Sequence, residues 1–120
     1  MQQRYLACTL LFIFCTLGLF AQETLSDKKK RATDFYYLNK YQAAQSVLFS
    51  IKKNRQEDKE TKLLLALCYY HLNQLKEAEP MLRSILETEK SPFPETWLYL
   101  GKIYHDQHEF TRAIEYYKLT

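Results

Sequence analysis

Apolar residues recur along residues 25–120 with the spacing of amphipathic helices, and short polar turns interrupt them. The turns are predicted at residues 39–40 and 73–74, between paired helices. Residues 26–27 (Ser-Asp) suit the start of the first helix, and Pro94 suits the start of a later one. Pro80 is expected to bend its helix slightly without breaking it. The pattern predicts an all-helical chain of helix-turn-helix units.

These helical units repeat. Ala44, Ala78 and Ala113 lie 34 and 35 positions apart, and an aromatic residue or leucine stands three positions before each. The third copy is the most distinctive, because Trp97, Leu100, Gly101 and Tyr104 have the spacing W-x2-L-G-x2-Y. Trp97, Leu100 and Tyr104 share one stripe of a helix, while Gly101 leaves room for a second helix to approach.

This pattern resembles the tetratricopeptide repeat (TPR) family, whose helix-turn-helix unit has about 34 residues. The resemblance implies an all-α, right-handed solenoid of about three repeats, at residues 25–58 (degenerate), 59–92 and 94–120 (incomplete and uncapped). Lys28 and Lys62 depart from the pattern at the place of Trp97, and the basic run 28–31 is expected to be a solvated edge. The residues that would define the repeat core are Ala44, Tyr69, Ala78, Trp97, Leu100, Gly101, Tyr104, Ala113 and Tyr117.

Residues 1–21 have the pattern of a secretory signal peptide, with Arg4 ahead of an apolar run and Ala21 at the cleavage position. Cleavage near Ala21 would give a secreted or periplasmic protein with no other membrane segment. Leu19 departs from the usual small residue, so an uncleaved anchor is the alternative. A leader ahead of TPRs also resembles certain bacterial envelope proteins that carry an OmpA-like peptidoglycan-binding domain.

Composition argues against several functions. Seventeen basic and fourteen acidic residues give a net charge of +3, too small to indicate nucleic-acid binding. Two glycines in the chain leave no phosphate-binding loop, so no cofactor is expected. Cys68, the only cysteine of the predicted mature chain, is interpreted as a small buried residue and not as a nucleophile.

One cluster has the composition of a metal site. His105 and His108, with Asp106 and Glu109, could together supply metal ligands. They straddle a predicted turn between two helices, however, and a solvated turn is the preferred interpretation. With no metal site expected and no catalytic motif present, the sequence predicts a protein that is not an enzyme.

A binding role has more support. In a TPR solenoid the first helix of each repeat lines a concave groove, and the resemblance places there Tyr36, Tyr37, Leu67, Tyr70, His71, Lys102 and His105. Tyr36 and Tyr70 would either contact a partner or fill the space between repeats, and both interpretations stay open. The carboxylate-clamp variety of TPR is not expected, because Thr33 and Leu67 replace the asparagines that it needs.

The sequence therefore predicts an exported scaffold that binds a protein or peptide partner of unknown identity in its groove. The alternative is a structural segment of a larger envelope protein that docks through an uncapped C-terminal face. The chain is expected either to continue past Thr120 or to have this face covered by a partner. Self-association through the same face is expected in their absence.

Overall fold

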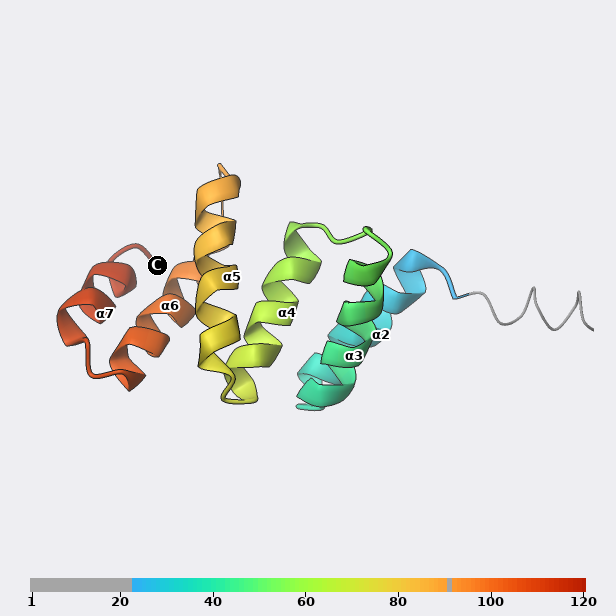
Figure 1. Cartoon of the computed structure of the whole chain (residues 1–120), viewed down its shortest axis with the longest axis horizontal. Helices are drawn as coiled ribbons and strands as arrows, with labels where there is room; N and C mark the ends of the chain where they lie inside the picture. The colour runs from blue at the N-terminus through green and yellow to red at the C-terminus, as the bar shows by residue number, and fades with distance from the viewer. Residues whose placement is uncertain (1–22, 91) are drawn as a thin grey trace, which may run out of the picture.

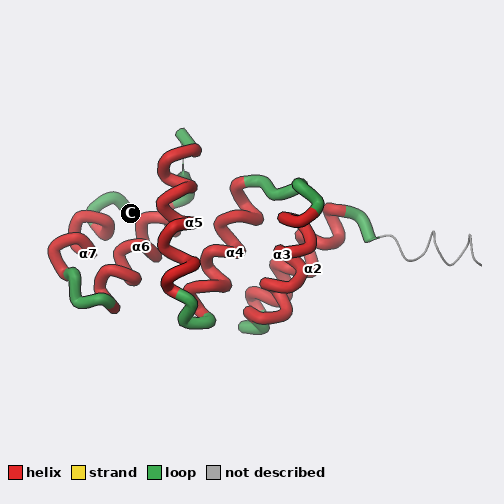
Figure 2. Tube along the Cα trace, in the orientation of Figure 1, coloured by secondary structure: helices red, strands yellow, loops and turns green. Residues whose placement is uncertain are grey.

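The computed structural model describes residues 23–90 and 92–120, so the predicted leader and its cleavage site lie outside the described residues. Six helices follow one another along an elongated body (Figure 1). Within the described ranges every regular element is helical (Figure 2). The helices are α2 (Leu25–Tyr37), α3 (Tyr41–Lys53), α4 (Lys59–His71), α5 (Leu75–Thr88), α6 (Pro94–Asp106) and α7 (Phe110–Tyr117).

The helices stack as three antiparallel pairs, α2 with α3, α4 with α5, and α6 with α7, and α3 packs on α4 as α5 packs on α6. Along one side α2 contacts α4 and α4 contacts α6. Across the described residues, α3, α5 and α7 make no such contacts with one another. The helices α2, α4 and α6 therefore form the inner row of a curved stack. This arrangement confirms the predicted all-α TPR solenoid.

The three turns inside the pairs have the same backbone geometry. Asn39, Asn73 and His108 have φ values of 60°, 60° and 62°, in the left-handed region. In each turn the next residue donates its amide to the carbonyl five positions earlier, as in Lys40 to Phe35 at 2.8 Å. These bonds satisfy the last carbonyls of the helix. Arg55, with φ 57°, ends α3 in the same way between the first two pairs.

The core consists of two connected clusters of buried side chains. Ala44 belongs to the first cluster, which α2, α3 and α4 form, while Ala78 and Ala113 belong to the second, which α4 to α7 form. All three alanines are at most 1% exposed, so the repeat positions read from the sequence lie in the core. Leu100 and Tyr104 are also buried, and Tyr69 and Tyr117 are half-buried against the second cluster.

Three details differ from the sequence analysis. Trp97 is only half-buried and is not among the side chains that pack against either cluster. The N-cap of α2 is Thr24, whose hydroxyl accepts from the amide of Asp27 at 3.1 Å. The run 28–31 is not simply solvated, because the half-buried Lys28 donates to Ser50 Oγ at 3.1 Å and Lys29 pairs with Asp58.

Pro80 and Pro94 both lie within helices. Pro94 is the first residue of α6, where its missing amide hydrogen leaves no helical bond unmade. Pro80 lies inside α5, which continues through it from Leu75 to Thr88. No helix among the described residues is long and apolar enough to cross a membrane.

Candidate partner-binding groove

A group of aromatic rings joins the three repeats along the inner row. The His71 ring stacks on Tyr41, with centroids 4.4 Å apart and planes at 9°. Its Nε2 lies 3.2 Å from the hydroxyl of Tyr36 and 3.3 Å from that of Tyr99. Tyr70 in turn packs edge-to-face on Tyr99 at 5.0 Å. One histidine of α4 therefore connects side chains of α2, α3 and α6, and fixes how successive repeats stack.

This packing changes the acid–base properties of its members. Burial among the rings lowers the pKa of His71, and the nearby charge of Lys102 adds to the effect. Burial raises the pKa of Tyr36, with its hydrogen bonding to Tyr99 as the next cause. Both side chains are therefore neutral at physiological pH, as suits polar groups held between apolar surfaces.

A hollow of about 210 Å³ opens beside this group. Leu63 and Leu67, at 8% and 6% exposure, form its floor on α4. Tyr36 and Tyr37 at the end of α2 line it, and Phe93 closes it from the segment before α6. The remaining lining residues are Glu60, Leu64 and Glu95. The result is an apolar hollow with aromatic walls, which matches the anchor pockets of protein interfaces.

The structure brings together some of the predicted groove residues but not all of them. Tyr36, Tyr37 and Leu67 line the hollow, and Tyr70 and His71 belong to the adjacent aromatic group. The Lys102 ammonium lies 4.5 Å from the centre of the Tyr99 ring. His105 lies apart from the hollow, because its ring packs on Phe110 of α7 at 5.3 Å.

Tyr36 and Tyr70 both pack between repeats, which is one of the two roles that the sequence left open. Tyr36 packs against both buried clusters, and Tyr70 packs against the second and donates to Asp106 Oδ2 at 3.4 Å. Both are therefore inter-repeat packing residues, and Tyr36 also forms a wall of the hollow. Tyr37 meets the Tyr36 ring edge-on at 5.6 Å between centroids, but at 77% exposure most of its surface faces solvent.

Sequence reasoning missed Phe93, Tyr41 and the two glutamates. Phe93 stands between two prolines, and the following proline holds it extended at φ −65° and ψ 143°. A large apolar side chain in such a linker has to pack on a neighbouring element, and this signal was available in the sequence. The stacking of Tyr41 on His71 crosses a repeat boundary, so no spacing within one repeat could indicate it.

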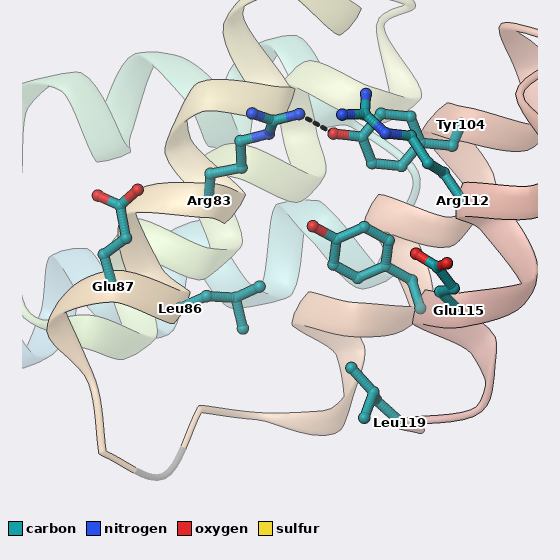
Figure 3. Close-up of a pocket in the computed structure, with 8 residues that line it drawn as sticks. Arg83, Leu86, Glu87, Tyr104, Arg112, Glu115 and Leu119 are labelled. Carbon is teal, nitrogen blue, oxygen red and sulfur yellow. Dashed lines mark hydrogen bonds between the residues drawn. The ribbon is translucent and has the colours of Figure 1, made fainter.

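A larger hollow of about 500 Å³ lies on the opposite side, between α5, α6 and α7. Figure 3 shows the guanidinium groups of Arg83 and Arg112 near the Tyr104 ring, with Leu86 and Leu119 below. Arg83 pairs with Glu79 at 3.0 Å, and Arg112 with Glu109 at 3.2 Å. Both guanidinium groups of this hollow are therefore paired within the chain, whereas Glu87 and Glu115 form no ion pair among the described residues.

His105 and His108 take part in packing at the turn before α7. Both rings contact Phe110, at 5.3 and 5.9 Å between centroids. Over residues 23–90 and 92–120, no three potential ligand side chains come close enough to hold a metal ion. Cys68 is buried, and burial raises the pKa of its thiol to about 12, so it stays protonated.

Residues 29–93 match the tetratricopeptide repeat family. The chain belongs to this family. The match begins one residue after Lys28, so it covers most of α2 and all of α3, α4 and α5. Repeats of this family mediate protein–protein interactions.

Two curated relatives are BBSome complex member BBS4 of Mus musculus and of Bos taurus, with identities of 32% and 29% over 106 residues. Each alignment covers 88% of this chain, and the chain spans about a fifth of the length of these relatives, 20% in both cases. No solved structure matches the chain.

Proposed function

We propose that this TPR unit binds a segment of a partner protein along the inner row of α2, α4 and α6. The observation that carries this proposal is the apolar hollow of about 210 Å³ with its leucine floor and tyrosine walls. The exposed Tyr37 supports it, because a large aromatic side chain at 77% exposure gains contact area when a partner covers it. Membership of a family of interaction repeats supports it as well.

The role is one of binding and not of catalysis. Cys68 is protonated and inaccessible, and His105 and His108 pack on Phe110. The tyrosines with shifted pKa values, such as Tyr36, have them raised, which removes them further from use as bases.

A displayed library of random peptides, selected on the full chain, would test the proposal. Fluorescence anisotropy of the selected peptides should show binding that Tyr37→Ala weakens by roughly 5- to 30-fold, the loss of one aromatic anchor. Phe110→Ala is the matched control, because Phe110 is 51% exposed but lies on α7. Peptides that lose affinity only with Phe110→Ala would refute binding in the inner row.

A second candidate function is assembly through the α6–α7 end. Phe110, Ile114 and Leu119 are 51%, 53% and 57% exposed there. A group of exposed apolar side chains is typical of a protein interaction surface. The curated relatives are members of a protein complex by name, which supports this candidate. The full chain should self-associate with rising concentration in sedimentation, and Ile114→Glu should reduce this. A monomer at every concentration would refute it.

Export remains part of the proposal, and its support is the leader pattern predicted from the sequence of residues 1–21. Placement in the periplasm or on the cell surface follows from the same segment and from the resemblance to envelope TPR proteins. N-terminal sequencing of protein recovered outside the cytoplasm should start at Gln22. Recovery of Met1 on membrane-bound protein would favour the uncleaved anchor.

A further inference from the structure

We infer that the inner-row hollow selects a partner segment in which a large apolar residue stands close to a lysine or arginine. This inference rests on the proposed function and adds the chemistry of the partner. Three features of the molecule support it, namely the size of the hollow, the charges at its rim and the contacts of the nearby lysines.

Size indicates a side chain as the occupant. At about 210 Å³ the hollow is smaller than most small-molecule sites, which begin at about 300 Å³. Leu63 and Leu67 at its floor offer no polar atom to a ligand, so a leucine, phenylalanine or methionine fits best. Tyr37 lines the hollow and is largely exposed, and its hydroxyl can bond to the backbone of the same segment.

Charge indicates what stands next to that side chain. Glu60 and Glu95 both line the hollow, each in the first turn of its helix. Among the described residues neither glutamate forms an ion pair; their exposed carboxylates can therefore accept from a partner's cation. The first turn of a helix stabilises an acidic residue by itself, but it does not require two such residues to border one apolar hollow.

The nearby lysines leave this negative character in place. Lys29 is paired with Asp58, the N-cap of α4, and is not free to neutralise the rim. Lys59 lies over the Phe93 ring, 5.2 Å from its centre, and therefore borders the hollow; the two glutamates outnumber this one lysine, and the net charge of the three side chains is negative. Lys102 lies over Tyr99, farther along α6 towards its last turn. A segment that binds with its cation towards the first turns of α4 and α6 meets opposite charge there, and the reverse orientation does not.

Anisotropy titrations of the full chain with matched fluorescent peptides would test the inference. Each peptide carries one central leucine, and lysine, glutamine or glutamate occupies the positions two and three residues away. At low salt the lysine peptide should bind roughly 3- to 10-fold more tightly than the glutamate peptide, as expected for two exposed ion pairs. The difference should shrink as the salt concentration rises.

Charge reversal at the rim separates this inference from the proposed function. The double variant Glu60→Lys with Glu95→Lys should invert the preference. Glu87→Lys with Glu115→Lys, on the opposite hollow, changes the net charge equally and should leave it intact. Equal effects of both double variants, or peptides that bind regardless of charge, would overturn the inference while the groove still binds. If none of the peptides binds, the proposed function fails too.

Discussion

A Cβ atom on Gly101 would lie 2.5 Å from Cε1 of Tyr117, so α6 and α7 approach through a glycine and an aromatic ring. In the two earlier repeats, the residue at the position of Gly101 is larger and the residue at the position of Tyr117 is smaller. The first repeat has Ala32 with Leu48, and the second has Ala66 with Leu82. Each pair lies within one buried cluster. The sizes of the two residues are therefore matched within every repeat.

We expect this matching to appear as a change of sign in a double-mutant cycle. Gly101→Ala should lower the free energy of unfolding in the parent, because overpacking costs about 1–3 kcal/mol. In the Tyr117→Leu background the same change should raise it by up to about 1 kcal/mol, the difference in helix propensity. Urea denaturation measures all four proteins. Equal effects of Gly101→Ala in both backgrounds would contradict the matching.

The second prediction concerns Arg55, whose φ of 57° lies in the left-handed region. A residue with a Cβ atom pays about 1–2 kcal/mol to adopt this conformation, and glycine adopts it without that cost. Arg55→Gly should therefore raise the free energy of unfolding by up to about 1 kcal/mol after the greater entropy of the unfolded chain is counted. Asn73→Gly is the control and should gain less, because asparagine tolerates this region better. An equal or smaller gain for Arg55→Gly, measured by thermal melting, would refute the explanation.

The third prediction concerns Asp58, the N-cap of α4. Its side chain accepts from the amide of Thr61 at 2.9 Å and pairs with Lys29. Burial alone would raise the pKa of this carboxyl, but the hydrogen bonds from Lys29 and Thr61 lower it from 3.8 to about 2. A lowered folded pKa means that the stabilisation is present above pH 3.8 and is lost as the pH falls towards 2.

Asp58→Ala should therefore lower the free energy of unfolding by about 0.5–2 kcal/mol at neutral pH. Asp58→Asn should lose less, because the amide oxygen still caps the helix. Parent and Asp58→Ala should converge when denaturation is repeated in acid. A constant difference down to the lowest accessible pH would show that the carboxylate charge is not involved.

Periodicity made the repeat predictable, because alanines at a fixed interval can be counted without knowing any contact. It also marked the turns: Asn39 and Asn73 stand where the chain needs a left-handed residue. The role of Lys62 could not be read in this way. The Lys62 ammonium donates to Ser84 Oγ at 2.7 Å on the paired helix, and Lys28 donates to Ser50 Oγ in the same way. In these two repeats, the lysine at the position of Trp97 therefore forms a hydrogen bond with a serine of the second helix, and the spacing of the repeat does not predict this bond.

The site was predictable only in part, for a related reason. The resemblance indicates which helices form the inner row, and two of the residues that it places there, Tyr37 and Leu67, line the hollow. It does not indicate how far each side chain is buried between neighbouring repeats. That depends on contacts such as Tyr41 with His71, between residues thirty positions apart with no common place in the repeat.

The fourth prediction uses the lowered pKa of His71, which burial among its aromatic neighbours causes first and Lys102 second. Because the folded pKa is below the ordinary histidine value of 6.5, the folded state binds fewer protons than the unfolded state. Stability should therefore fall as the pH drops below 6.5. His71→Gln, which cannot be protonated, should lack this part of the loss.

Melting temperatures at about pH 7.5 and about pH 5.5, at constant ionic strength, measure the effect. The advantage of the parent over His71→Gln should be larger at the higher pH. His108→Asn is the control for removing a histidine outside the aromatic group, and it keeps a residue that tolerates the left-handed turn. A parent and a His71→Gln protein with parallel pH profiles would contradict the prediction.

The last prediction separates binding from packing on the inner row. Tyr37 is 77% exposed, so Tyr37→Ala should change the free energy of unfolding by no more than about 0.5 kcal/mol. It should still weaken a groove-binding peptide by about 1–2 kcal/mol. Leu65, at 0% exposure, should behave in the opposite way: Leu65→Ala should cost about 2–5 kcal/mol of stability and affect binding only through unfolding. Tyr36→Ala should lower both quantities, because Tyr36 packs on both clusters and lines the hollow.

Denaturation and anisotropy on the same samples distinguish the three variants. A Tyr37→Ala protein that binds as tightly as the parent would move the binding surface away from the inner row, and the exposed side chains of α7 would be the next surface to test.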